Sequence, residues 1–447
     1  MIRVRVPSKQ GHVFALPKKM KKDEATKTKR HVRRVTSTIN SSSIEIFLIR
    51  SDVTLIFLNC YLTMKFALSA LLLVSIPATY GFSVGGTFLS NAEKAALEET
   101  AAAVATPGKG ITACDEGPAT IGGRFEAVGI ENSEETRRKY RQMLFEAEGC
   151  ENYLSAAILD PETLYQRSDS GKLFPEVLTE RGIVPGIKPH LKIYTLPGTN
   201  GDTVMQGLDS LAVRCKEYYD AGARFAKWRS PLVIDMEKGC PTDLAIKANM
   251  QDLARYALIC QSEGLMPIVE PDISLSGSHT LEEAVDVNIR VQSELFKAMI
   301  DHGVYMTGST LKPNIVNPGK DCKMSYTVDE IAEANIFVFE QSFPVAMKGC
   351  NYLSGGQSLN QAAARLSAIN KANKKGPWNL SFSWSQALQL PLLDLCKGKG
   401  ELQLEEMSKL YVEELKIASA AAKGEYEWKA GDGSHFGKVE EKELVEA

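Results

Sequence analysis

Beyond residue 106 the chain alternates short apolar runs with longer segments in which apolar residues recur every three or four positions. The short runs, rich in β-branched residues, predict buried strands, and the longer periodic segments predict amphipathic helices. The eight predicted strands are residues 109–116, 154–159, 183–188, 223–228, 265–270, 306–312, 344–354 and 379–384. The clearest helices are predicted over residues 133–146, 203–221, 242–263, 281–302 and 358–374.

Regular alternation of strand and helix is typical of βαβ units and a parallel sheet. Eight such units over roughly 290 residues predict an α/β fold, a single closed (β/α)8 barrel with additional N- and C-terminal helices. An open doubly wound sheet is the alternative, but no GxGxxG motif follows the first predicted strand to favour it. We therefore expect one barrel domain over residues 91–447, including a C-terminal tail.

The first 90 residues differ from the rest in charge and pattern. Residues 1–63 carry 13 Lys/Arg and 4 Asp/Glu, which leaves 39 and 51 for the remainder. That acidic remainder disfavours a nucleic-acid or anionic-membrane surface. Met64 begins the run MKFALSALLLVSIPATYGFS, which has the layout of a secretory signal peptide and is too short to span a bilayer as a mature helix.

Residues 64–90 are therefore predicted to hold a signal peptide, cleaved before Phe82, and a short transit-like segment. The aromatic residue after the cleavage site resembles the bipartite plastid-targeting signals of diatoms and related algae, which implies plastid localisation. The secretory pathway and the cytoplasm are the alternatives. Nine cysteines without CxxC or metal-type spacing indicate reduced thiols and argue against an oxidising destination.

A signal peptide belongs at an N-terminus, so Met64 is the expected start. Residues 1–63 are then a basic extension that need not be translated. A nuclear or nucleic-acid-binding signal is the rival interpretation of its basic run.

Ionisable or small residues stand at the ends of most predicted strands. They are Asp115, Lys188, Lys227, Glu270 and Lys312, and Ser354 with Gly355 and Gly356. In a barrel all these ends meet at one mouth, where catalytic groups lie. A single charged residue at a strand end is more often a solvated loop residue or half of a surface ion pair. Three lysines and two carboxylates at the same end of successive strands are better explained by a site.

The residue types in this set favour imine chemistry. A lysine crowded by other cations in a partly desolvated pocket loses its proton more readily and can attack a carbonyl to form a Schiff base. Glu270 suits the proton transfers of imine formation, and Asp115 suits a base that acts on a hydroxyl group as a carbon–carbon bond breaks. Gly355 and Gly356 let backbone N–H groups approach an anion. The set predicts a phosphorylated ketose as substrate, while the six histidines form no HxH or HxxxH pair for a zinc-type site.

The motifs PGKGITACDE, FAKWR, PIVEP, TLKPN, YLSGGQS and SFSW resemble those of the class I fructose-bisphosphate aldolases, and the resemblance spans residues 91–426. It implies a (β/α)8 barrel, usually a homotetramer, that needs neither metal nor cofactor. The implied reaction is cleavage of fructose 1,6-bisphosphate to dihydroxyacetone phosphate and glyceraldehyde 3-phosphate. It would serve glycolysis or, in a plastid, the reductive pentose phosphate cycle.

The resemblance also implies a role for each matching residue. Lys312 of TLKPN resembles the Schiff-base lysine, Glu270 of VEP the acid/base that dehydrates the carbinolamine, and Asp115 of ACDE the base for carbon–carbon cleavage. Lys227 of FAKWR resembles the lysine that assists both steps. The implied substrate contacts are Lys188, Arg229 near the second phosphate, Arg124 near the substrate, and Ser354, Gly355 and Gly356 at the first phosphate.

Several positions depart from the family pattern. Gln386 of WSQAL stands where the family usually has an arginine at the first phosphate. An amide supplies no cation, so affinity for that phosphate is expected to fall unless Lys348 or another group compensates. Gly117 replaces a common serine, Asp272 shortens a glutamate, and the chain ends in LVEA where the animal enzymes have a tyrosine.

These departures keep two alternatives open. One is a related Schiff-base aldolase that prefers sedoheptulose bisphosphate or a monophosphate. The other is an inactive scaffold protein on the same fold, against which the retained lysines and carboxylates argue.

Overall fold

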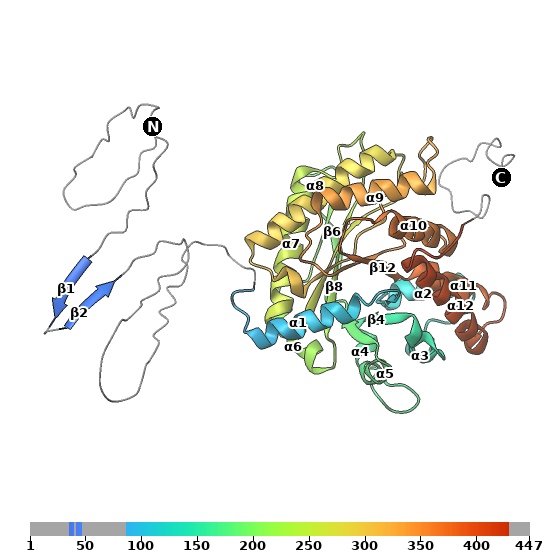
Figure 1. Ribbon diagram of the computed structural model, residues 1–447. Coiled ribbons are helices and arrows are strands. Elements are labelled where there is room, and N and C mark those ends of the chain that lie inside the picture. Colours follow the sequence, from blue (N-terminus) through green and yellow to red (C-terminus); the bar gives the residue numbers. More distant parts are fainter. Residues whose placement is uncertain (1–34, 40–41, 47–85, 429–447) are drawn as a thin grey trace. The chain divides into compact units, whose positions relative to one another are not determined.

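Eight parallel strands form a closed barrel, and their order around it follows their order along the chain (Figure 1). The computed structural model describes residues 86–428 and, upstream, the strands β1 (Val35–Ile39) and β2 (Ser42–Ile46), which pair with each other antiparallel. The barrel strands are β3 (Gly110–Cys114), β4 (Leu154–Leu159), β5 (Val184–Ile187), β8 (Phe225–Leu232), β9 (Met266–Ile273), β10 (Thr310–Leu311), β11 (Gly349–Tyr352) and β12 (Asn379–Trp384). The predicted closed barrel is confirmed.

Helices surround the barrel, and polar side chains fix where several of them begin. Thr242, Thr280 and Ser358 each accept a hydrogen bond from the backbone N–H three residues further on. Such caps satisfy donors that have no partner within the helix. The helices are α1 (Asn91–Val104), α2 (Pro118–Glu126), α3 (Glu134–Glu146), α4 (Pro161–Leu164), α5 (Phe174–Glu180), α6 (Leu211–Asp220), α7 (Asp243–Ser262), α8 (Leu281–Asp301), α9 (Val328–Ser342), α10 (Leu359–Ala372), α11 (Gln386–Asp394) and α12 (Leu404–Ala422).

The barrel interior is apolar towards the amino ends of its strands, where α1 packs. Leu97, Ala101 and Val104 of α1 share one buried cluster with inward-facing residues of β3, β4, β8 and β9. In β8 and β9 those residues are Phe225 and Ile268, and because side chains two apart share a face, the next inward positions are Lys227 and Glu270. The charged layer of the barrel thus rests directly on an apolar one.

One predicted helix is wrong over its first eight residues. Residues 203–221 begin with a short strand, β7 (Thr203–Met205), which pairs with β6 (Ile193–Thr195) in a hairpin between β5 and β8. Gly207 then adopts φ +126°, a conformation that ends any regular element, and α6 starts only at Leu211. Thr203 and Val204 are β-branched, and such residues favour strands, so this preference outweighs the helix-like spacing of apolar residues in the segment.

Several strand ends differ from prediction as well. β8 and β9 run on to Leu232 and Ile273 and pair with each other over eight positions, whereas the predicted strands end at residues 228 and 270. Lys227 and Glu270 therefore lie inside strands rather than at their ends. Of the predicted strand 306–312, the first three residues form a 3-10 turn and only Thr310 and Leu311 form a strand, β10. The predicted strand 344–354 is also too long, because β11 spans only Gly349–Tyr352.

The predicted leader and tail lie outside the described residues, except for residues 86–90. The described part of the chain has no helix with the length and apolar character needed to cross a membrane. Seven of the eight cysteines in the described residues are buried, and all eight are free thiols.

Glu414 of α12 is a buried carboxyl group with only 5% of its surface exposed. Among the described residues, no hydrogen-bond partner reaches its Oε2 atom. Burial disfavours the carboxylate and raises the pKa of Glu414 to about 8. In the unfolded chain the pKa has its ordinary value, so folding stability is greatest below that value and falls as the pH rises towards about 8.

Replacing this group is expected to remove that pH dependence. Glu414→Gln should raise the free energy of unfolding at pH 8 by about 1–3 kcal/mol and leave it little changed at pH 4.5. Urea unfolding at both pH values measures the effect. Glu413→Gln is the matched control, because the Glu413 side chain is 64% exposed and pairs with Lys416. Equal shifts at the two pH values would contradict the prediction.

Candidate active site

Four ionisable side chains meet at the carboxyl end of the barrel. The ammonium of Lys227 lies 2.8 Å from Oδ2 of Asp115 and 3.0 Å from Oε2 of Glu270. The other oxygen of Glu270 lies 3.1 Å from the ammonium of Lys312. Asp115 directly follows β3 and Lys312 directly follows β10, so four different strands supply the cluster. The structure thus brings together the four residues predicted to do the chemistry.

Burial and neighbouring charges set the two lysines apart. Burial alone disfavours both ammonium groups. For Lys227, the attraction of Asp115 and Glu270 outweighs the effect of burial and holds the pKa above the ordinary lysine value. For Lys312, burial and the positive charge of Lys227 together outweigh the attraction of Glu270, so its pKa lies below the ordinary value. Lys312 is therefore the lysine that gives up its proton more readily.

The two carboxyl groups show the opposite balance. Burial would raise the pKa of each, but the positive charges of Lys227 and Lys312 outweigh it. Lys188 adds to this effect at Asp115, and Arg229 adds to it at Glu270. Both pKa values lie below their ordinary range, so both groups are ionised at neutral pH.

Lys188 borders the cluster on the side of β5. Its ammonium donates to the Asp115 carbonyl at 2.5 Å and lies 2.7 Å from Oδ2 of Asp160. Asp160 directly follows β4, so it obeys the same strand-end rule as the predicted residues, and the sequence analysis missed it. Gly117 leaves space here, because a Cβ atom at that position would lie 3.8 Å from Lys188 Nζ and make no clash.

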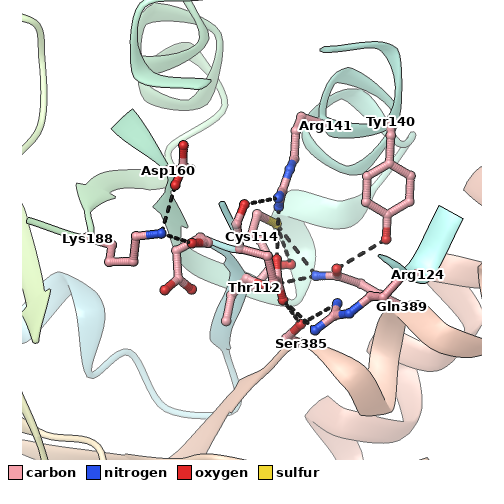
Figure 2. A network of polar contacts seen from close by, with 12 residues as sticks. Thr112, Cys114, Arg124, Tyr140, Arg141, Asp160, Lys188, Ser385 and Gln389 are labelled. Carbon is pink, nitrogen blue, oxygen red and sulfur yellow. Dashed lines mark hydrogen bonds and ion pairs between the residues drawn. The ribbon is translucent and has the colours of Figure 1, made fainter. Parts of the chain in front are cut away.

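Arg124 belongs to a second charged network, also missed from sequence, which centres on Glu116. Its guanidinium lies 2.9 Å from Glu116 Oε1 and donates to the Ser385 hydroxyl at 3.1 Å. The Ser385 hydroxyl donates in turn to Glu116, and Arg141 of α3 lies 3.2 Å from the second Glu116 oxygen. Figure 2 shows Arg124 beside Ser385, with Arg141 joining the same network. Both terminal nitrogens of the Arg124 guanidinium, Nη1 and Nη2, thus have partners inside the protein.

Arg229 lies two positions beyond Lys227 on β8. Its Nε atom donates to Oδ2 of Asp272 at 2.5 Å, and 45% of its side chain is exposed. The shorter carboxylate of Asp272 therefore holds Arg229 from the neighbouring strand. Almost half of the Arg229 side chain still remains exposed while this pair is formed.

A glycine turn follows β11 on another side of the mouth. Gly355 and Gly356 have φ angles of +59° and +84°, a left-handed conformation that glycine adopts without strain. Ser354 before them is buried, and Ser358 after them caps α10. A turn of this kind directs successive backbone N–H groups outward and suits an anion.

Two side chains approach this turn, one from the start of α11 and one from the loop between β10 and α9. A Cβ atom at Gly356 would lie 3.7 Å from Oε1 of Gln386 and 3.3 Å from Nζ of Lys320. Gln386 is held there because α11 is anchored by Gln389, which donates to the Ala113 carbonyl of β3 at 2.8 Å. The suggestion that Lys348 compensates for Gln386 is wrong, since Lys348 precedes β11 and lies at the amino end of the barrel.

Across residues 86–428 no group of three or more His, Cys, Asp or Glu side chains is arranged to hold a metal ion.

Comparison with known proteins identifies relatives with the same fold. A family model for fructose-bisphosphate aldolase class I matches residues 96–444. The fructose-bisphosphate aldolase of Dictyostelium discoideum is 44% identical over 339 residues, 76% of this chain and 94% of that protein. Cytosolic fructose-bisphosphate aldolase 4 of Arabidopsis thaliana is 45% identical over 340 residues, 76% of this chain and 86% of that protein. A solved structure of the Plasmodium falciparum aldolase superposes with a TM-score of 0.73 at 39% identity, over 76% of this chain and 98% of that one.

The difference between the two buried lysines can be tested directly. In Lys227→Met, Lys312 loses a like charge, and both carboxylates lose their main counter-ion. Both changes favour the Lys312 ammonium, so its pKa should rise. The rate at which cyanate carbamylates Lys312, followed by mass spectrometry, should then reach half its maximum at a higher pH.

Lys216→Met is the matched control, since Lys216 is exposed and its ion-pair partner among the described residues is Asp220. An unchanged or acid-shifted midpoint in Lys227→Met would show that Lys227 does not set the Lys312 pKa.

Proposed function

We propose a role for each site residue from the premise that the chain belongs to the class I fructose-bisphosphate aldolase family. It is therefore a lyase that cleaves fructose 1,6-bisphosphate reversibly to dihydroxyacetone phosphate and glyceraldehyde 3-phosphate, without a metal ion. The observation that carries the assignments is the unequal sharing of Glu270 and Asp115 between the two buried lysines. Lys227 has both carboxylates and stays charged, whereas Lys312 has only one.

Lys312 is the nucleophile. Its neutral amine attacks the ketone carbon of the substrate and forms a carbinolamine. Glu270, 3.1 Å from Lys312, takes part in the proton transfers that release the hydroxyl group as water and leave a protonated imine. The buried ammonium of Lys227 supplies Glu270 with a proton source and a fixed counter-ion.

Asp115 is the base for cleavage. It is held ionised, so it can accept the proton of the C4 hydroxyl as the bond between C3 and C4 breaks. The electron pair of that bond moves to the imine and forms an enamine, and the aldehyde product departs. Protonation of the enamine and hydrolysis then release the ketone and restore Lys312.

The two phosphates lie on opposite sides of this cluster in our assignment. Lys188 and Arg229 hold the second phosphate: the Lys188 ammonium lies beside Gly117, and 45% of the Arg229 side chain is exposed. The turn Ser354, Gly355 and Gly356, with Gln386, binds the first phosphate. Arg124 acts near the substrate through its contact with Ser385, the neighbour of Gln386.

Preference among ketose substrates depends on the second-phosphate side. Fructose 1,6-bisphosphate, sedoheptulose 1,7-bisphosphate and fructose 1-phosphate share the same three-carbon end with the first phosphate. Gln386 therefore affects all of them alike, and the alternatives of a sedoheptulose bisphosphate or monophosphate preference rest on the groups around Gly117 and Arg229. Comparing kcat/KM for the three substrates decides between them.

Trapping with borohydride separates the two chemical roles. Lys312→Ala should form no adduct with dihydroxyacetone phosphate and should lose turnover. Asp115→Asn should still form the adduct, while cleavage of fructose 1,6-bisphosphate falls by about 10²- to 10⁴-fold. Mass spectrometry locates the adduct, and a wild-type sample with EDTA is the control for metal dependence. Equal loss of trapping and cleavage in Asp115→Asn would place Asp115 in imine formation instead.

We further propose that the enzyme acts in a plastid, in the reductive pentose phosphate cycle or glycolysis, and as a homotetramer. The support for the compartment is the signal-like run from Met64 and the aromatic Phe82. Support for self-association comes from apolar side chains left exposed on the barrel helices, such as Val213, Ile300 and Phe337.

A fluorescent protein fused after residue 90, expressed from Met64 in a diatom, should enter the plastid, and Phe82→Ala should stop it before that compartment. Delivery of both fusions to the same place would exclude the aromatic signal. Sedimentation of the protein from residue 82 onward tests the tetramer.

A further inference from the structure

Lys320 lies on the loop between β10 and α9, eight positions beyond Lys312, and its backbone is held in place. Its N–H donates to the Leu275 carbonyl at 2.9 Å. The neighbouring N–H groups of Gly319 and Asp321 donate to the carbonyls of His279 and Gly277, at 2.8 and 2.9 Å. Three consecutive backbone bonds therefore tie this loop to the loop that follows β9.

The contact between these loops is close enough to require glycine. A Cβ atom at Gly319 would lie 2.2 Å from the Gly277 carbonyl oxygen, which no side chain tolerates. Leu275 of the same loop also reaches the glycine turn, since a Cβ atom at Gly355 would lie 3.6 Å from its Cδ1. The Lys320 backbone and the turn after β11 are thus parts of one packed arrangement.

The Lys320 ammonium reaches the turn from this fixed backbone. It lies 3.3 Å from where a Cβ atom of Gly356 would be, and the neutral Gln386 amide lies 3.7 Å from the same point. Within residues 86–428, no carboxylate pairs with Lys320 and no acceptor takes a hydrogen bond from its ammonium. By contrast, Arg124 is already engaged by Glu116 and Ser385. Lys320 is therefore the cation beside the turn that has no competing partner in the described chain.

We propose that Lys320 is the residue that binds the first phosphate as a cation and sets the affinity of this enzyme for it, in place of the charge that Gln386 lacks. The inference rests on the proposed assignment of the Ser354, Gly355 and Gly356 turn to that phosphate. A phosphate dianion is bound by backbone N–H groups and by a cation together, and a lysine acts there as a point charge that need not approach from a fixed direction.

The test compares Lys320→Gln with the control Lys323→Gln, an exposed lysine three positions along the same loop. Three quantities are measured: the half-saturating concentration of dihydroxyacetone phosphate in borohydride trapping, and kcat/KM for fructose 1,6-bisphosphate and for fructose 1-phosphate. Lys320→Gln should raise the half-saturating concentration and lower both kcat/KM values, each by about 10- to 100-fold, as expected for loss of a charged hydrogen bond. Lys323→Gln should match wild type, and Lys320→Arg should retain most of the affinity.

A second substitution tests whether the missing positive charge at the turn causes the loss of affinity in Lys320→Gln. Adding Gln386→Arg to Lys320→Gln places a cation on α11 beside Gly356 and should restore most of the lost affinity. The melting temperature of each variant shows whether it is folded.

The outcomes are distinct. Equal behaviour of Lys320→Gln and Lys323→Gln overturns the proposal. A loss confined to fructose 1,6-bisphosphate also overturns it, because Lys320 would then serve the second phosphate. Failure of wild-type protein to form any adduct on Lys312 is a failure of the proposed imine chemistry, and the wild-type sample reveals it before any variant is compared.

Discussion

The ion-paired arrangement of Asp115, Lys227 and Glu270 is the constraint on which the rest of the structure depends. A charge moved from water into a protein interior costs several kcal/mol unless partners compensate for the lost solvation. Lys227 and Glu270 are each only 3% exposed, so neither is stable there without the other. The cluster has to be assembled complete, with its charges alternating in sign, and that requires β3, β8, β9 and β10 to bring their side chains together at one mouth of the barrel.

The barrel provides that arrangement through the strand period. Lys227 and Glu270 continue the inward faces of β8 and β9 above Phe225 and Ile268, and α1 seals the apolar layer below them. The apolar floor keeps water from the cluster on one side. It thereby strengthens the attraction between the charges and makes the Lys312 ammonium less stable, so the pKa of Lys312 falls while that of Lys227 rises. Packing below the site thus strengthens the electrostatic effects by which the carboxylates distinguish Lys312 from Lys227.

Much of this is readable from the sequence because it depends on short-range patterns. Buried strands give apolar runs, and a charged residue at the end of such a run marks the mouth, which identified Asp115, Lys188 and Lys312. The extension of β8 and β9 past Pro231 and Pro271 was not readable, because their mutual pairing overrides the usual effect of proline. The β6–β7 hairpin was likewise hidden, since short β-branched segments fit helix and strand patterns alike. Lys320 gave no signal at all, because its position depends on hydrogen bonds between two loops distant in sequence.

The two parts of the site differ in how strictly position matters. Proton transfer needs donor and acceptor within hydrogen-bond reach, so Lys312, Glu270 and Asp115 tolerate little displacement and are carried on barrel strands. Holding a phosphate depends mainly on the summed potential of charges within a few ångströms, which falls only gradually with distance. Gln386 on α11 and Lys320 on the loop after β10 both lie close to Gly356. A cation on either element satisfies the same electrostatic requirement, so the charge can be supplied by a loop without any change to the catalytic strands.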